Sequence, residues 1–382
     1  MKVVIIGSAY PLRGGLAAYN ERLARAFTEA GDEVSIYSFS LQYPSFLFPG
    51  KSQFSSGPAP EGLRIKTRIN SINPFNWFSA GNEIRRENPD LVICPFWLPF
   101  MGPCLGTVLR RIKRNGHTKI VSIVHNIVPH EKRPGDRMFA RYFVNAADAF
   151  IAMSRAVLQD LKAFSSAKPM VFSPHPIYDQ FGNSIPRDEA LRRLGLDEKS
   201  RYMLFFGFIR DYKGLDLLIG AFADARLRGR GLKLIVAGEF YTDPGPYHEL
   251  IARHKLENDI LLHTDFIPDS KVADYFCAAD IVVQPYKDAT QSGVTQIAYH
   301  FGKPMLVTDV GGLGEMVPQG RVGYVVKPSA PAIADALVDF YVNRREEEFV
   351  PHVMEEKKKY TWDKMVAAIK GLAGYQGGRG PV

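Results

Sequence analysis

The chain has 382 residues, 46% of them hydrophobic and 23% charged, a balance that excludes disordered, collagen-like and coiled-coil proteins and suggests two domains. Its three cysteines, Cys94, Cys104 and Cys277, form no CxxC pair, which excludes a disulfide-stapled secreted scaffold and a structural zinc site and indicates a reducing compartment. The formal net charge of +8 is uneven, because residues 1–178 hold 22 Lys and Arg against 12 Asp and Glu, and residues 179–382 hold 26 against 28.

Short apolar runs alternate with amphipathic helical stretches along the whole chain. The runs predicted as strands are residues 3–7, 33–39, 90–94, 119–125, 148–154, 201–207, 232–238, 259–263, 280–285, 304–309 and 323–326. Helices are predicted between these runs, for example over residues 16–31, 215–227 and 331–343. Apolar runs that are linked by helices are typical of parallel strands covered on both faces. The two series of strands predict an α/β protein with two Rossmann-like, doubly wound domains, which separate within the polar, proline-containing stretch 173–190.

No segment is predicted to cross a membrane. The N-terminal apolar run VVII is shorter than the apolar region of a signal peptide. Residues 91–109 carry no charge, but Pro95, Pro99 and Pro103 interrupt them. A buried strand, a proline-rich loop and a helix that begins near Gly102 are therefore predicted there.

The loop after the first strand carries Gly14 and Gly15 and leads directly into the helix predicted over residues 16–31. Glycines allow a ligand to approach the backbone closely, and a helix N-terminus offers free N–H groups to a phosphate. The loop does not match the GxGxxG fingerprint, and no acidic residue ends the second strand where a nicotinamide ribose would need one. The pattern indicates either a phosphate site or a tightly packed turn.

Two cations follow the first strand of the second series. Arg210 and Lys213 lie three positions apart between strand 201–207 and the next helix, at the strand end where ligands bind in parallel sheets. A diphosphate requires such charge neutralisation, whereas two solvated cations at the start of a helix would oppose its dipole. This pair therefore favours a phosphate site.

Another strand-to-helix turn follows strand 280–285. The next helix opens with Ser292, Gly293 and Val294, whose backbone N–H groups could donate hydrogen bonds to a phosphate. Gln291 can add hydrogen bonds from its side chain.

Two histidines lie near the end of strand 119–125. His125 ends the strand itself, and His130 and Glu131 follow on the loop. A lone histidine is more often structural than catalytic, and the strand-end position leaves both interpretations open for His125.

These motifs, in this order, resemble those of retaining glycosyltransferases with the GT-B fold, of the family 4 type. The resemblance rests on the Gly-Gly loop, the strand-end histidine, the Arg/Lys pair and the late turn TDVGG at 308–312. The closing segment 358–372 resembles the part of that fold that crosses back to the first domain. The expected domains are residues 1–178 with 359–382, on the acceptor side, and residues 179–358, which bind the nucleotide-sugar.

The resemblance implies transfer of a sugar, with retention of configuration, from a nucleotide-diphosphate donor. It assigns the diphosphate to the backbone of Gly14 and Gly15, to Arg210 and Lys213, and to the N–H groups that open the helix after strand 280–285. The family's arginine directly after the strand-end glycine is replaced by Phe208, so its role is assigned to Arg210.

The resemblance places His125 against the donor sugar, as a catalytic residue together with the two cations, and His130 and Glu131 on the acceptor side. It describes a front-face reaction, in which the leaving phosphate oxygen helps to remove the proton of the acceptor. It implies neither a metal nor any other cofactor, and the sequence contains no Asp-x-Asp to hold a metal.

One departure concerns two glutamates of the family, separated by seven residues. Counted back from Gly-Lys-Pro at 302–304, their positions hold Ala289 and Ile297, and Gln291 or Gln296 is the nearest substitute. Two alternatives therefore stay open: a sugar-nucleotide-binding protein without transferase activity, and a GT-B sugar-nucleotide epimerase.

The basic first domain combines its charge with aromatic residues that are predicted to lie in loops. These are residues 39–54, 72–78 and 94–103, with Arg64, Lys66, Arg68 and the cluster 110–114 nearby. Aromatic and basic residues together favour an anionic bilayer or a polysaccharide or lipid-linked acceptor, against the alternative of core aromatics and solvated cations. Nucleic acid is disfavoured because no known binding module is present. The protein is expected in the cytoplasm, either free or on the inner face of the membrane.

Overall fold

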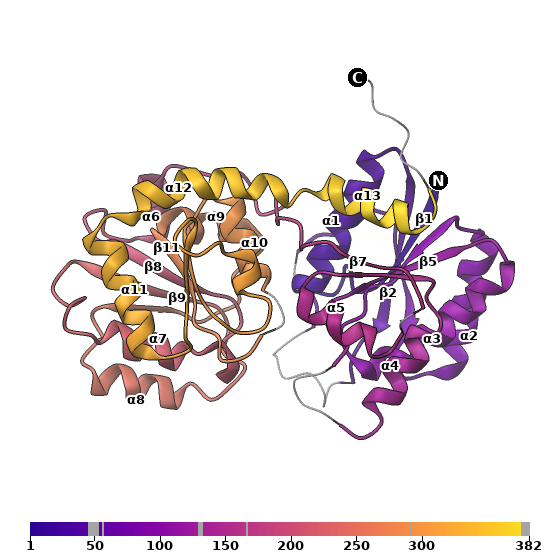
Figure 1. The fold of residues 1–382 in the computed structure, drawn as a ribbon, viewed down its shortest axis with the longest axis horizontal. Coiled ribbons are helices and arrows are strands. Elements are labelled where there is room, and N and C mark those ends of the chain that lie inside the picture. The colour runs from indigo at the N-terminus through magenta and orange to yellow at the C-terminus, as the bar shows by residue number, and fades with distance from the viewer. Residues whose placement is uncertain (45–52, 56, 129–132, 166, 290–291, 376–382) are drawn as a thin grey trace. The chain divides into compact units, whose positions relative to one another are not determined.

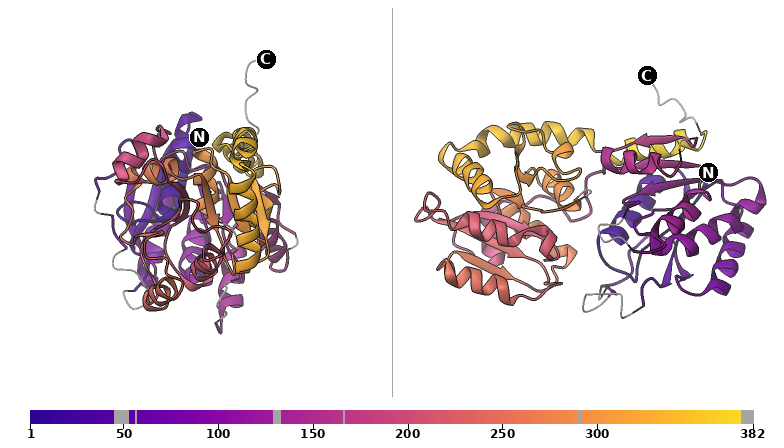
Figure 2. Two further views of the ribbon diagram at one scale, coloured as in Figure 1. Left: turned by 90° about the vertical axis from the view of Figure 1, so that its left-hand side faces the viewer. Right: turned by 60° about the horizontal axis from the view of Figure 1, so that its bottom comes forward.

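Two parallel sheets organise the chain (Figures 1 and 2). The computed structural model describes residues 1–44, 53–55, 57–128, 133–165, 167–289 and 292–375. One compact unit consists of Met1–His175 with Thr361–Val382, and the other of Pro176–Tyr360. These limits lie a few residues from the domain boundaries expected at 178 and 359.

The first unit holds a seven-stranded sheet in the order β3-β2-β1-β4-β5-β6-β7, in which every pairing is parallel. Its elements are β1 (Lys2–Ile6), α1 (Gly15–Glu29), β2 (Glu33–Leu41), β3 (Ile65–Asn70), α2 (Pro74–Glu87), β4 (Leu91–Ile93), α3 (Gly102–Ile112), β5 (Lys119–Val124), α4 (Asp136–Val144), β6 (Ala149–Ala152), α5 (Arg155–Lys162), β7 (Met170–Phe172) and α13 (Trp362–Leu372). The apolar faces of α2, α3 and α4 join alternate strand residues in one core.

The second unit holds a six-stranded parallel sheet in the order β10-β9-β8-β11-β12-β13. Its elements are α6 (Arg187–Leu194), β8 (Arg201–Phe206), α7 (Leu215–Phe222), β9 (Leu232–Ala237), α8 (Gly245–Arg253), β10 (Ile260–His263), α9 (Asp269–Ala278), β11 (Ile281–Gln284), α10 (Gly293–His300), β12 (Met305–Thr308), β13 (Gly323–Val326), α11 (Ala330–Val342) and α12 (Arg345–Glu356). Residues of α7, α8 and α11 form a second core with β8, β9 and β11.

The predicted α/β class with two doubly wound sheets is confirmed. In each sheet the strand order reverses beside the first strand, because β1 lies between β2 and β4, and β8 lies between β9 and β11. Ligands bind at such reversals, beyond the carboxyl ends of the strands. The loops after β1, β5, β8 and β11, which carry the predicted site residues, all leave these ends.

Two strands and one helix differ from the sequence prediction. The edge strands β3 and β7 were not predicted, because three exposed positions in β3 and the shortness of β7 hide the apolar signal. The aromatic segment 72–78 is not a loop, since α2 begins at Pro74 with Asn73 as its N-cap. The uncharged segment 91–109 forms β4, a short turn and α3, as predicted. Among the described residues, no helix has both the length and the apolar character needed to span a bilayer.

The last helix, α13, packs in the first unit although the whole second unit precedes it in the chain. The Trp362 ring lies 5.2 Å from that of Tyr19 on α1. Lys370 forms an ion pair of 2.7 Å with Asp32, which is almost fully buried. The crossover back to the first domain, expected from the resemblance, is therefore present.

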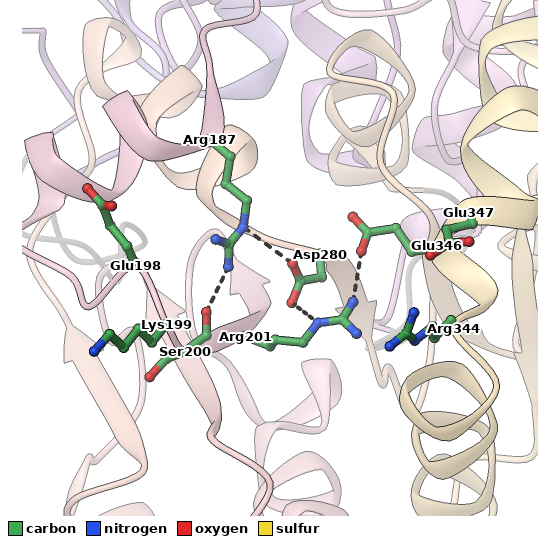
Figure 3. Close-up of a pocket in the computed structure, with 9 residues that line it drawn as sticks. All are labelled: Arg187, Glu198, Lys199, Ser200, Arg201, Asp280, Arg344, Glu346 and Glu347. Carbon is green, nitrogen blue, oxygen red and sulfur yellow. Dashed lines mark hydrogen bonds and ion pairs between the residues drawn. The ribbon is translucent and has the colours of Figure 1, made fainter.

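A buried carboxylate ties several elements together at the amino edge of the second sheet. The Asp280 side chain, 4% exposed, lies 3.3 Å from Arg201 and 3.5 Å from Arg187, and its Oδ2 accepts from the Tyr202 N–H at 2.9 Å. Arg201 also pairs with Glu346 of α12 at 2.8 Å. Figure 3 shows Asp280 with Arg187, Arg201 and Glu346 in the lining of a cavity whose volume is about 370 Å³. Because this cavity lies at the strand edge opposite the predicted donor site and its inner charges are paired, we interpret it as structural.

We expect Asp280→Asn to lower the free energy of unfolding of the second unit by about 3 kcal/mol, because two arginines lose a buried partner. Denaturant unfolding followed by circular dichroism measures this loss. The control is Asp335→Asn, which changes an exposed pair with Arg226 and is expected to cost less than about 1 kcal/mol. Equal effects of the two substitutions would contradict the structural role of the buried carboxylate.

Candidate active site

Lys213 is a buried cation at the carboxyl end of the second sheet. Its side chain belongs to a short turn, Asp211–Lys213, directly before α7, and only 9% of the residue is exposed. Burial, with a smaller contribution from nearby Arg210, lowers the pKa of its ammonium group below the usual value. Among the described residues, no carboxylate pairs with it and no hydrogen-bond acceptor reaches it. A buried charge without a partner is costly, so this position is suited to receive an anion.

Lys213 lies near the start of α10, the helix whose first N–H groups the sequence analysis assigned to the phosphate site. A Cβ atom placed on Gly207 would lie 3.0 Å from Lys213 Nζ and 3.8 Å from Val294 Cγ2. The strand-end glycine, the lysine and the first turn of α10 therefore come together. A side chain at position 207 would occupy the space beside the ammonium group.

The N-terminus of α10 is capped by Ser292. Its Oγ accepts the Val294 N–H at 3.2 Å, so this N–H is engaged within the cap. The first turn of α10 contains no acidic residue, and its positive dipole end is therefore not offset there. Gln291 lies outside the described residues.

Arg210, the second predicted cation, lies over an aromatic ring. Its guanidinium carbon is 5.2 Å from the centre of the Tyr241 ring, and the Phe208 ring lies 4.4 Å from that ring at an angle of 33°. Backbone hydrogen bonds from Ile209 to Glu239 and from Tyr241 to Ile209, of 2.8 and 2.9 Å, hold the two loops together. No carboxylate within the described ranges forms an ion pair with Arg210. The aromatic contact was not foreseen, since it joins loops that are about thirty residues apart.

In the first unit, the Gly-Gly loop opens α1 as predicted. Gly14 is the N-cap and has a φ of 106°, a backbone conformation that favours glycine. A Cβ atom at this position would meet nothing within 4 Å, so the loop is open on that side. Backbone hydrogen bonds from Arg13 to Gln53 and from Ser55 to Pro11 fix the loop, at 3.0 and 2.8 Å. The adjoining Gly15 begins the helix.

His125 follows β5 and is packed among aromatic rings. Its ring centre lies 5.3 Å from that of Tyr19, at an interplanar angle of 82°, and Tyr19 also contacts His175 at 5.0 Å. Burial, assisted by repulsion from His175, lowers the pKa of His125 to about 3. The imidazole is therefore neutral near pH 7. Tyr19 and His175 were not predicted, because neither belongs to a motif, and His130 and Glu131 lie outside the described residues.

The two positions of the family's glutamates are apolar and buried. Ala289 and Ile297 are 5% and 6% exposed. Gln296, one of the two substitutes considered, is buried, and its Oε1 has no hydrogen-bond partner in the described part of the chain. No acidic side chain therefore occupies either glutamate position.

No group of three or more His, Cys, Asp or Glu side chains within the described ranges is arranged to hold a metal ion. The expectation that the reaction needs no metal stays a prediction, because part of the chain lies outside those ranges.

Comparisons with known proteins define the class to which this fold and site belong. Residues 13–194 match the family model described as Glycosyltransferase Family 4, and residues 200–343 match the one described as Glycosyl transferases group 1. Solved glycosyltransferases with the GT-B fold superpose along nearly the whole chain. The protein is thus a GT-B glycosyltransferase, and the chain belongs to the family 4 type.

Two solved structures illustrate the likeness of fold. Sucrose-phosphate synthase from Thermosynechococcus elongatus is 16% identical, with a TM-score of 0.73 over 97% of this chain and 98% of its own. Anabaena Alr3699/HepE in complex with UDP is also 16% identical, with a TM-score of 0.73 over 97% of this chain and 100% of its own.

Curated relatives are more similar in sequence. D-inositol 3-phosphate glycosyltransferase 1 of Catenulispora acidiphila is 26% identical, over 85% of this chain and 82% of its own length. D-inositol 3-phosphate glycosyltransferase of Xylanimonas cellulosilytica is 26% identical, over 93% of this chain and 90% of its own length. These relatives agree with the class that the two family models give.

The low pKa of His125 predicts a pH dependence of stability. Between pH 6.5 and about 3 the unfolded chain protonates this histidine and the folded chain does not, so the free energy of unfolding falls as the pH falls through this range. In His125→Gln this contribution is absent, and the slope of stability against pH is expected to be smaller. Denaturant unfolding from pH 7 to pH 4 measures the slope, with the exposed His248→Gln as control. An unchanged slope in His125→Gln would show that the imidazole is not shielded from protons.

Proposed function

We propose that the protein is a retaining glycosyltransferase that takes a sugar from a nucleotide-diphosphate donor. The observation that carries this proposal is Lys213, a buried cation without an anionic partner among the described residues, next to the first turn of α10. Arg210 adds a second cation from the same loop. Together they match the charge of a diphosphate, and the UDP complex of the Anabaena structure supports a nucleotide donor.

The proposed chemistry depends on stabilising the diphosphate as it leaves. Negative charge grows on its oxygens while the bond to the sugar breaks, and donors fixed in advance stabilise that charge more than they stabilise the substrate. Lys213, Arg210 and the dipole of α10 supply this stabilisation without a metal. The leaving oxygen then accepts the proton of the acceptor hydroxyl, which attacks the same face of the sugar.

In the first unit, the roles that the resemblance implies for the Gly14 loop and for His125 stay predictions. A neutral imidazole is able to share a hydrogen bond with a sugar hydroxyl without adding charge. Its low pKa favours this role over that of a cation.

A second candidate is a sugar-nucleotide-binding protein without transferase activity. The apolar side chains at positions 289 and 297 favour it, since glutamates there usually contact the donor. Incubation of the protein with a UDP-sugar and a lipid extract distinguishes the candidates. A transferase releases UDP only with the acceptor, an epimerase converts the sugar without one, and a binding protein does neither.

The acceptor is proposed to be anionic or to lie at an anionic membrane. The names of the curated relatives specify an inositol phosphate, which supports a phosphate-bearing acceptor. The first part of the chain carries the basic excess, although the three basic residues singled out between positions 64 and 68 are already paired. These are Arg64 with Glu33, Lys66 with Glu87 and Arg68 with Glu83.

The start of α2 presents the apolar side chains that a bilayer surface would accept. Phe75 is 87% exposed, and Ile72 and Phe78 are about half exposed. The last turn of α2 carries Arg85 and Arg86, whose charges complement anionic headgroups. By contrast, Phe39 and Phe96 of the same set of predicted surface aromatics are buried in the core.

We expect Lys213→Ala and Arg210→Ala each to weaken nucleoside-diphosphate binding by about 10- to 100-fold, the range for losing a charged hydrogen bond. A thermal-shift panel of UDP, GDP and ADP first identifies the nucleotide, because a ligand that binds only the folded chain raises the unfolding midpoint. Titration calorimetry then gives the dissociation constants.

The matched control for these substitutions is Lys287→Ala. Lys287 lies on the neighbouring loop but already pairs with Asp216 at 2.7 Å, so its loss is expected to change the affinity less than about twofold. Wild-type affinity in Lys213→Ala would refute the donor site.

The protein is also expected to co-sediment with vesicles that contain phosphatidylglycerol, and to do so less as salt screens the attraction. Phe75→Ser is expected to weaken this binding about tenfold, because an aromatic side chain no longer enters the bilayer surface. Met354→Ser, at a half-exposed apolar position on α12, is the control. Absence of binding at low salt would remove the membrane from the proposal.

A further inference from the structure

We infer that Tyr286 is a positioning residue that holds Lys213 and the N-cap of α10 in one arrangement around the donor diphosphate, an inference that rests on the proposed function. Tyr286 lies in the loop after β11 and is 3% exposed. No sequence motif pointed to it, and the mechanism above does not use it.

The ring of Tyr286 lies against the ammonium group of Lys213. Lys213 Nζ is 5.4 Å from the ring centre, within the distance at which a cation is attracted to an aromatic face. The Tyr212 and Tyr286 rings form a T-shaped contact, with their centres 6.2 Å apart and an interplanar angle of 85°. In the absence of an anion, the aromatic face therefore offsets part of the cost of burying the ammonium group and restricts its position.

The hydroxyl group of Tyr286 shares a hydrogen bond with Ser292 Oγ at 3.3 Å. Ser292 Oγ is the atom that caps α10 through the Val294 N–H. Burial raises the pKa of Tyr286 to about 12, so the hydroxyl keeps its proton at any physiological pH. One side chain thus contacts the lysine with its ring and the helix cap with its hydroxyl.

The backbone keeps the two loops in contact. A Cβ atom on Gly214, which has a φ of 67°, would lie 2.0 Å from the Pro285 carbonyl oxygen, so this approach requires glycine. The Lys287 N–H donates to the Tyr212 carbonyl at 2.6 Å. From the other side, Thr308 Oγ1 donates to the Tyr286 carbonyl at 2.5 Å. The position of Tyr286 is therefore fixed from β8, β11 and β12 together.

This arrangement joins two groups that come from different strand ends. Lys213 follows β8, and Ser292 follows β11. Stabilisation of a growing charge is strongest when its donors are fixed before the reaction. Tyr286 performs this function for the diphosphate because it restrains both groups at once.

The test separates positioning from simple packing with double-mutant cycles. The full-length chain is titrated with UDP, or with GDP if UDP does not bind. Tyr286→Leu removes the ring and is expected to weaken binding about tenfold in the wild-type background and less than about twofold in Lys213→Ala, because coupled residues are not additive. Tyr286→Phe keeps the ring and is expected to weaken nucleotide binding about threefold in the wild-type background. In the Ser292→Ala background, the same substitution is expected to leave the affinity unchanged.

The control is Tyr324→Phe, which removes another partly buried tyrosine hydroxyl of the same unit, one that donates to Asp339, and is expected to leave binding unchanged. Additive effects in both cycles overturn the inference, because a packing role weakens binding equally in every background. If Tyr286→Leu does not fold, the cycle of Tyr286→Phe with Ser292→Ala decides alone. Wild-type binding by Lys213→Ala overturns the proposed donor site instead, so the two failures are distinguishable.

Discussion

The proposed donor site depends on one unfavourable interaction, the burial of the Lys213 ammonium group without a carboxylate among the described residues. Elsewhere in this unit, the Arg187 and Arg201 side chains share the buried Asp280. An isolated buried charge costs free energy, and proteins retain such groups mainly at functional sites. Under the proposed function, the donor diphosphate supplies the anion that relieves this cost, so that donor binding and the stability of this loop would be linked.

The proposed diphosphate site is assembled from strand ends, not from one continuous motif. The loop after β8 supplies both cations, the loop after β11 supplies the helix cap, and aromatic rings from neighbouring loops lie against each cation. The apolar residues at positions 289 and 297 leave the sugar to be recognised by other groups.

Much of this arrangement was predictable from the sequence, since buried parallel strands are apolar runs and phosphate sites follow them. The positions of the loops with Gly14, Arg210 and Lys213 at strand ends were predicted in this way, and their role in binding phosphate stays a prediction. The edge strand β3 was not predicted, because its exposed residues interrupt the apolar pattern. Tyr241 and Tyr286 were not predicted for a different reason: each contacts its cation from the loop after a neighbouring strand, and no local sequence pattern indicates contacts between loops tens of residues apart. Likewise, the burial of Phe39 and the exposure of Phe75 depend on which face of an element each occupies.

The placement of α13 has a consequence for folding during synthesis. The first unit buries Tyr19 and Asp32 against Trp362 and Lys370, but the ribosome makes these last two residues only after the entire second unit. During translation at about 5–20 residues per second, synthesis of the second unit is therefore complete before that of α13. The surface of the first unit that α13 covers stays exposed for about 10 s or more. An apolar surface exposed for that time is a binding site for a chaperone, and the N-terminal half is the part of the newborn chain that such a chaperone would protect.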